Sequence, residues 1–356
     1  MIPRPAYLAN IQVLRFVAAV MVLYAHLLHE TADHGLPTAA AIHDPTGIAW
    51  RTGVDVFFIV SGFIMYYLSH DKFGAWRNAA DFLRRRLLRV VPMYWLFTGL
   101  MLAALALFHD HIVHTDLTPQ TLAGSLLFFP VVRADGDVYP ILAVGWTLEY
   151  EIFFYACFAL ALLAPRRIGL AALTAGFLAL SLAWHFIDKT HVALKSYSDP
   201  IILEFLMGML LAHLYLRGVT VNRWVQGGCV AVGFGLMALL GGCQQLDRWI
   251  WAGLPAFVVA FGLALGPQIK SRWPAMGGDA SYSLYLSHPF VLSSLALVWA
   301  KARLPADGWS YVATGMVLCI AVSLIVYRLI EAPLLRALRR RFEPERAQAI
   351  AAQGGP

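Results

Sequence analysis

The sequence predicts an all-α polytopic membrane protein with about ten transmembrane helices and both termini in the cytoplasm. Of its 356 residues, 60% are hydrophobic and only 13% are charged, whereas soluble domains are about 45–50% apolar and about 25% charged. Apolar runs recur along the whole chain, and Lys and Arg gather in alternate loops. This composition excludes a soluble globular enzyme, a disordered protein and a disulfide scaffold.

Ten segments are apolar enough to cross a bilayer, which takes about 20 residues at about 1.5 Å per residue. They are Ile11–His29, Val54–Ser69, Leu87–Phe108, Ile141–Ala164, Ile168–Ile187, Ile201–Leu216, Trp224–Gly241, Trp249–Leu265, Ser281–Ala300 and Trp309–Ile330. The second and sixth are short. Thr121–Val132 is too short to span and is expected to be interfacial or re-entrant. Residues 1–336 therefore form one membrane domain, and residues 337–356 a basic, flexible cytoplasmic tail.

The distribution of Lys and Arg predicts the orientation. With the N-terminus inside, the inner segments hold 19 of these residues and the outer segments 7. Ten helices keep this alternation, whereas an odd number would break it. The net charge of +6 therefore reports orientation in the bilayer rather than binding of nucleic acid, and we expect a multi-pass protein of the cell inner membrane.

Two ionisable residues share one face of the first segment. Arg15 and His26 are eleven residues apart, which is three helical turns plus about 20°. Arg15 lies toward the cytoplasm and His26 toward the outside. The simpler alternatives are an arginine that snorkels to the interface and an interfacial histidine. Because ionisable groups in hydrocarbon are costly, each is a candidate functional residue.

Further polar residues are expected near the outer half of the membrane. Asp55 opens the second segment on the side of His26, and Ser61 lies mid-membrane, where Ser61-Gly62 is also typical of close helix packing. Of Glu149 and Glu151, which are two residues apart, at most one can face the His26 site. Glu204 lies in the outer third of the sixth segment. A carboxylate beside the histidine would orient its tautomer and raise its basicity.

On the inner side, Arg86 and Arg89 are three residues apart and share a helix face. Guanidinium groups so placed suit a phosphate-rich ligand, although a positive-inside anchor would also explain the run Arg84–Arg89. The ninth segment opens with hydroxyls and an imidazole, including Tyr285 and His288. His109, His111 and His114 form a loop cluster that is expected to be solvated, so no metal site is predicted.

Six motifs occur in an order that resembles the integral-membrane acyltransferase family 3, and within it the exopolysaccharide-production acetyltransferases. They are Arg15 with His26, Gly53–Phe63, Arg86-Leu-Leu-Arg89, Trp146-Thr-Leu-x-x-Glu151, Tyr282-Ser-Leu-Tyr-Leu-Ser-His288 and Glu331-Ala-Pro333. Each motif is weak alone, but six in order are specific. The resemblance covers roughly residues 8–336.

The resemblance implies transfer of an acyl group, with acetyl expected, from cytoplasmic acyl-CoA to a hydroxyl of an extracytoplasmic polysaccharide or its lipid-linked precursor. His26 would be the general base, with Asp55 or Glu151 orienting it. The expected acyl-CoA-binding residues are Arg15, Arg86, Arg89, Tyr285 and His288. Those expected on the acceptor side, or as structural residues, are Ser61, Trp146 and Glu204. Acyl-CoA is a substrate, and no permanently bound cofactor is expected.

Several alternatives stay open from the sequence. Transfer can be direct or can pass through a covalent acyl-histidine or acyl-serine. A transporter or flippase for a glycan or small anion would also carry intramembrane charges, although no internal repeat is evident. The unrelated membrane-bound O-acyltransferases also use a membrane histidine, but the motif order does not favour them. The sequence predicts contact with the lipid bilayer but no particular oligomeric state, sugar or hydroxyl.

Overall fold

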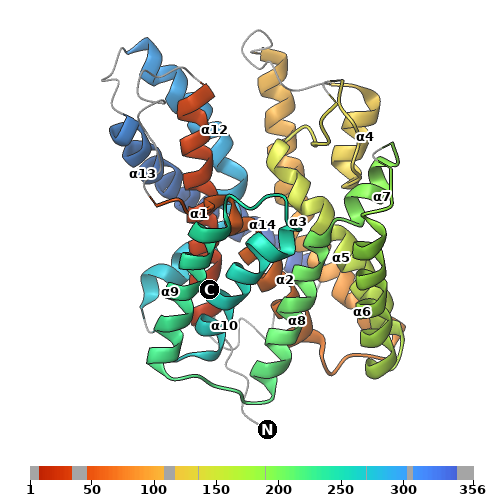
Figure 1. Ribbon diagram of the computed structural model, residues 1–356. Helices are drawn as coiled ribbons and strands as arrows, with labels where there is room; N and C mark the ends of the chain where they lie inside the picture. The colour runs from red at the N-terminus through yellow and green to blue at the C-terminus, as the bar shows by residue number, and fades with distance from the viewer. Residues whose placement is uncertain are drawn as a thin grey trace.

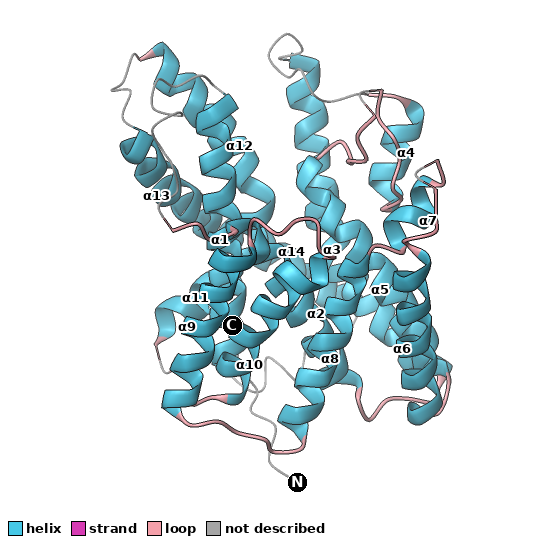
Figure 2. Cartoon of the chain, viewed as in Figure 1, coloured by secondary structure: helices cyan, strands magenta, loops and turns pink. Residues whose placement is uncertain are grey.

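The described part of the chain is built from helices joined by loops, as Figure 2 shows, and contains no strand. The computed structural model describes residues 8–33, 46–107, 117–134, 136–188, 190–269, 271–302 and 308–342. The α-helices are α1 (Ala9–Asp33), α2 (Gly53–Ser69), α3 (Trp76–Leu107), α4 (Pro119–Leu127), α5 (Trp146–Leu163), α6 (Arg166–Ala183), α7 (Val192–Tyr197), α8 (Leu203–Leu216), α9 (Arg223–Leu240), α10 (Leu254–Leu265), α11 (Arg272–Asp279), α12 (Ser281–Lys301), α13 (Gly308–Val326) and α14 (Ala332–Phe342). The predicted all-α class is confirmed.

Short helical segments of other types extend several of these helices. Three are 3-10 segments, η1 (Trp50–Thr52), η3 (Ala143–Gly145) and η4 (Pro200–Ile202). Two are π-helical, η5 (Trp249–Gly253) and η6 (Tyr327–Glu331). π-Helical turns are rare in proteins, and those that do occur are often found at functional sites.

Within the described residues, nine helical segments are long and apolar enough to cross a membrane. They match nine of the ten predicted segments. The exception is the eighth, Trp249–Leu265, which has 17 residues and so spans only about 25 Å of a hydrocarbon layer about 30 Å thick. The second and sixth, which looked short, are completed by η1 and by α7 with η4.

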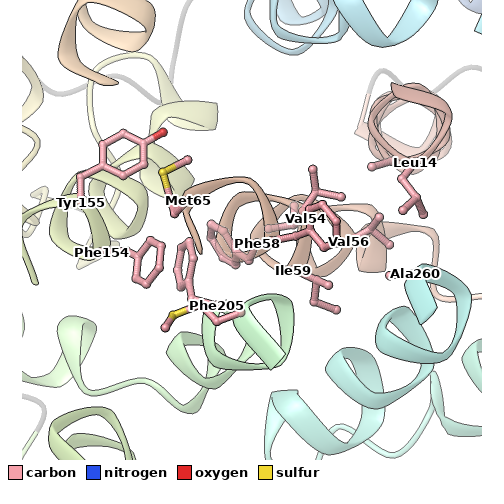
Figure 3. Close-up of a cluster of buried hydrophobic side chains, with 14 of the residues drawn as sticks. Leu14, Val54, Val56, Phe58, Ile59, Met65, Phe154, Tyr155, Phe205 and Ala260 are labelled. Carbon is pink, nitrogen blue, oxygen red and sulfur yellow. The ribbon is translucent and has the colours of Figure 1, made fainter. Parts of the chain in front are cut away.

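Helix α2 lies at the centre of the bundle. Its apolar side chains pack against α1, α5, α8 and α10 (Figure 3). It approaches α8 closely because both helices carry a glycine at the crossing. A methyl group added at Gly62 would lie 2.1 Å from the Phe205 carbonyl oxygen, and one at Gly208 would lie 2.0 Å from that of Ile59. The predicted small-residue packing at Gly62 is confirmed.

The remaining helices flank this centre on two sides. Figure 1 shows α1 with α12 and α13 on one side, and α3 with α5 and α6 on the other. We call the end of the bundle where α1, α3 and α12 begin the basic end, and the other the opposite end. Assignment of the basic end to the cytoplasm stays a prediction.

Two boundaries differ from the sequence predictions. The third predicted segment begins at Leu87, but α3 begins at Trp76, so the arginine run lies inside a helix of 32 residues. Hydropathy detects only the apolar part of a helix, while the backbone hydrogen bonds continue through charged residues. Helix α14 likewise continues to Phe342, so the first residues of the predicted flexible tail are helical. Residues 343–356 lie outside the described part.

Thr121–Val132, expected to be interfacial or re-entrant, overlaps the short helix α4, which begins two residues earlier at Pro119. The Thr118 side chain caps its start by accepting a hydrogen bond from the Thr121 amide. With nine residues, α4 is far too short to cross a membrane.

Candidate functional site

An internal cavity of about 120 Å³ lies between α1, α2, α3, α5 and α12. Apolar side chains such as Phe57 and Val90 form much of its wall, and polar groups enter it at a few points. These groups are Arg15, Ser61, Arg86, Arg89, Thr147, Glu151, Tyr155, Ser281, Tyr282 and Tyr285. A mostly apolar cavity with a few converging polar groups is the usual form of a small-molecule site.

A larger vestibule of about 510 Å³ lies at the basic end. Among the described residues its lining includes six cationic side chains and no acidic one, namely Arg15, Lys72, Arg85, Arg86, Arg89 and Arg339. Arg15, Arg86 and Arg89 line both the vestibule and the internal cavity. These three guanidinium groups therefore form the neck between the two spaces.

The neck arginines have no close acidic partner. Among the described residues, no carboxylate oxygen lies within 4.0 Å of Arg15, Arg86 or Arg89. Arg15 donates a hydrogen bond to Gln12 at 2.9 Å. Carboxylates including Glu151 act on Arg15 only electrostatically, from farther away. A positive group in a partly desolvated neck is costly unless an anion joins it.

The four arginines of the α3 run differ in whether a carboxylate lies close to them. Arg84 and Arg85 lie 2.8 Å and 3.6 Å from Asp81, which is half-exposed. Arg86 and Arg89, one turn apart, face the neck. The helix period places Arg86 and Arg89 on one face, as predicted.

Glu151 is held at the wall of the internal cavity by two hydroxyl groups. Ser61 on α2 donates to its Oε1 at 3.0 Å, and Tyr155, one turn along α5, also donates to Oε1. Of the two predicted carboxylates, Glu151 lines the cavity and Glu149 does not. Glu149 is nevertheless buried. Tyr155 and its role were missed, although the i, i+4 spacing from Glu151 is visible in the sequence.

Tyr285 closes the cavity on the side of α12. Its hydroxyl donates to the Val144 carbonyl at 2.6 Å and lies 2.7 Å from the Thr147 hydroxyl. The Tyr285 ring is 6.0 Å from that of Phe57, centroid to centroid. These contacts fix Tyr285 between the cavity and His288, whose ring centroid lies 6.1 Å away.

His26 and His288 form a pair of imidazoles beyond Tyr285. Their ring centroids are 4.8 Å apart, with the planes inclined at 60°. Each Nδ1 is bonded to the carbonyl four residues earlier, 2.9 Å from Val22 O and 3.1 Å from Leu284 O. Because a carbonyl only accepts, these contacts favour the tautomer with the proton on Nδ1, in which Nε2 of the neutral ring carries the lone pair. Such a lone pair is what a general base needs.

The position of His288 corrects one prediction. It was expected with the acyl-CoA-binding residues, but it lines neither the cavity nor the vestibule and lies against His26. Tyr285 and His288 share a face of α12, and that face packs against α1. Tyr285 lines the cavity, His288 lies beside Tyr285, and His26 lies beside His288.

Asp55 does not orient His26. Both of its oxygens accept from Arg248, from Nε and Nη2 at 2.9 Å each, and Asp55 is fully buried. Glu151, the other candidate, is bonded to Ser61 and Tyr155, while the backbone carbonyl of Val22 holds Nδ1 of His26. A hydrogen bond of the His26 ring thus runs from Nδ1 to a backbone carbonyl, and a carboxylate that orients this histidine stays a prediction.

Arg248 is a second site residue, after Tyr155, that sequence analysis missed. It directly precedes η5 and was counted only among the outer cations. Its guanidinium also lies over the rings of Trp146 and Trp251, at 5.8 Å and 5.6 Å. Glu204, fully buried on α8, interacts electrostatically with it. The signal that could have found Arg248 is Asp55 itself, since a carboxylate buried in a membrane needs a cationic partner.

The predicted site residues thus fall into three groups. Arg15, Ser61, Arg86, Arg89, Glu151 and Tyr285 line the cavity, His26 and His288 form the imidazole pair, and Asp55, Trp146 and Glu204 surround Arg248. The histidine cluster His109, His111 and His114 lies outside the described residues.

The chain matches the family model for the acyltransferase domain over residues 8–328. It is 36% identical over 297 residues to the exopolysaccharide production protein ExoZ of Rhizobium meliloti (strain 1021), covering 81% of this chain and 90% of that protein. It is 25% identical over 381 residues to the acyltransferase MdmB of Streptomyces mycarofaciens, covering 95% of this chain and 94% of that protein. No solved structure matches it. The match across nearly the whole helical bundle, with the site motifs inside it, shows that this chain belongs to acyltransferase family 3, the family of integral-membrane acyltransferases that its motifs resemble.

Proposed function

We propose that this membrane acyltransferase transfers an acyl group, most simply acetyl, from cytoplasmic acyl-CoA to a hydroxyl of an extracytoplasmic polysaccharide or its lipid-linked precursor. The similarity to a protein of exopolysaccharide production supports a saccharide acceptor. The excess of Lys and Arg supports a cytoplasmic basic end, and with it a location in the cell inner membrane.

The observation that carries the proposal is the neck of Arg15, Arg86 and Arg89. Three guanidinium groups converge there without an acidic partner within 4.0 Å among the described residues. Phosphate groups suit this arrangement because guanidinium binds them through two parallel hydrogen bonds. The nucleotide part of CoA would occupy the vestibule of about 510 Å³. Its narrow thioester arm would pass the neck into the cavity of about 120 Å³.

The imidazole pair supplies the proton transfer in this scheme. Nε2 of His26 would take the proton of the acceptor hydroxyl. At the same time the oxygen of that hydroxyl would attack the thioester carbonyl carbon. The carbon–oxygen bond forms, the carbon–sulfur bond breaks, and CoA leaves as a thiolate that receives the proton from His26. The Val22 carbonyl keeps Nδ1 protonated, so Nε2 is the basic atom throughout.

The test is acyl transfer by purified protein in lipid nanodiscs, with acetyl-CoA and de-O-acylated host exopolysaccharide and no ion gradient. We expect wild-type transfer and a loss of about 10²- to 10⁴-fold for His26→Ala, the usual contribution of a general base. The affinity for CoA should stay unchanged in that variant. His191→Ala, an exposed histidine at the same end, is the matched control.

Near-normal transfer by His26→Ala at equal protein amount would remove His26 from the mechanism. If the wild-type protein moves a glycan only when a gradient is present and never consumes acetyl-CoA, a transporter replaces the proposal.

A further inference from the structure

A groove crosses the opposite end of the bundle, away from the vestibule. It consists of two cavities of about 450 Å³ and about 420 Å³ that share Arg51 and Gln244 in their walls. One cavity extends to Trp184 at the end of α6, and the other reaches α1 at Ala25 and Leu28. Ala25 and Leu28 share a face of α1, and His26 lies on another face of the same helix. The groove therefore runs from the end of α6 to the helix that carries the proposed base.

The polar lining of the groove is balanced in charge. Arg51 and Arg248 face it together with Asp199 and Asp247, and Gln244 and Gln245 add neutral amides. The part of the vestibule wall that the structure describes has six cations and no acid. A lining with equal numbers of both signs does not select an anion. It offers both donors and acceptors, which is what a saccharide needs because each sugar hydroxyl both donates and accepts.

Contacts within the protein hold several of the groups that line the groove. Asp199 caps η4 by accepting from the Ile201 amide at 2.9 Å, and Asp247 lies 3.4 Å from Nε2 of His185. The guanidinium groups of Arg51 and Arg248 both lie near the Trp251 ring, 4.9 Å and 5.6 Å from its centroid. Pre-formed polar groups lose little entropy when they bind, so they can contribute affinity for a weakly held chain of hydroxyls.

Only a thin layer separates the groove from the acyl cavity. Arg248 lines the groove and binds Asp55, and the residue before Asp55, Val54, lines the cavity. Arg248 also covers Trp146, and the next residue, Thr147, lines the cavity. A chain lying in the groove would therefore pass directly over the space proposed for the thioester.

We propose that this groove binds the acceptor's saccharide chain on both sides of the sugar that is acylated, so that the enzyme recognises an oligosaccharide rather than a single sugar. The inference rests on the proposed function, whose donor side it leaves unchanged.

The test compares acceptors of increasing length. Size-fractionated oligosaccharides from de-O-acylated host exopolysaccharide, and the corresponding monosaccharides, serve as probes for the wild type and for Gln244→Ala/Asp247→Ala. We expect KM for the long acceptors to rise about 5- to 100-fold in the double variant, from the loss of two hydrogen bonds. KM for monosaccharides, kcat and the Kd for CoA should change little. Gln120→Ala, an exposed glutamine on α4 outside the groove, is the control.

Donor-free binding of the same oligosaccharides, measured by intrinsic tryptophan fluorescence, tests the groove separately from catalysis. Wild-type affinity should increase with chain length and decrease in the double variant. If wild-type protein binds the chains but transfers nothing from acetyl-CoA, the proposed function is wrong, and the proposal that the groove binds saccharide chains still holds. Equal affinities of the wild type and the double variant for oligosaccharides of every length would overturn the proposal that the groove binds them. Should the double variant be unstable, Gln245→Trp, which fills the groove at an exposed position, provides the same comparison.

Discussion

The arginines at the two ends of the bundle differ in how their charge is balanced. Near the opposite end, Arg248 holds Asp55 through two hydrogen bonds of 2.9 Å, and Asp55 is completely buried. At the basic end, Arg15, Arg86 and Arg89 converge on a neck with no acidic partner within 4.0 Å among the described residues. Both groups lie within a membrane domain, where charge is costly.

The difference separates a structural role from a binding role. A buried arginine with a bidentate carboxylate is already satisfied and links the helices that carry the two groups. Arginines without such a partner keep their donors available for an anion that arrives later. We therefore expect substitutions at the neck to change ligand affinity, and substitutions at the Asp55–Arg248 pair to change stability.

The largest effect should come from Arg86→Gln/Arg89→Gln. Each lost charge-assisted contact costs about 1.5–3 kcal/mol, so CoA affinity should decrease by about 10²- to 10⁴-fold if the two losses add. Arg86→Lys/Arg89→Lys should restore only part of the lost CoA affinity, because an ammonium group cannot form the two parallel hydrogen bonds of a planar guanidinium. Calorimetric titration with CoA measures the Kd of the purified glutamine variant and of the purified lysine variant. An unchanged Kd in the glutamine variant would show that these arginines only fix the topology.

The next effect should come from Asp55→Asn, which leaves Arg248 buried without a counter-charge. Removing one partner of a buried ion pair costs about 3–5 kcal/mol of folding free energy, so the thermal midpoint in detergent should fall by several degrees. The Kd for CoA should stay close to that of the wild type, because neither Asp55 nor Arg248 lines the vestibule.

A paired substitution sharpens that result. Asp55→Leu/Arg248→Met removes both charges and should recover much of the lost stability, since apolar replacement of a buried ion pair is often neutral or better. If the double variant is as unstable as Asp55→Asn, the pair contributes more than mutual charge compensation. If Asp55→Leu/Arg248→Met changes CoA affinity as much as the neck variant does, the two groups of arginines do not differ in role as proposed.

The smallest effect should come from Arg84→Gln. Arg84 pairs with Asp81 at 2.8 Å, but both side chains are nearly half exposed, and such surface pairs contribute about 0–1 kcal/mol. CoA affinity and thermal midpoint should both stay near wild-type values. Because Arg84 belongs to the same run as Arg86 and Arg89, a large loss of CoA affinity here would mean that the whole run acts as one diffuse positive field.

Helix period and hydropathy were enough to predict which residues of one segment share a face. The shared face of Arg86 and Arg89 and the ten apolar segments follow from regular geometry that every helix obeys. The boundary of α3 was predicted less well, since Arg84 and its neighbours continue the helix without being apolar.

The sequence by itself determined the membrane class, the order and faces of the helices and the chemical identity of the site residues, because these depend on local composition and period. Only the tertiary structure decided which of them meet. Asp55 and Arg248 are 193 residues apart in the chain, and no helical period relates residues of different segments. Packing of α1 against α12 brought His288 to His26 instead of to the arginines. The partner of each buried charge is set by how helices pack, and that depends on the whole bundle at once.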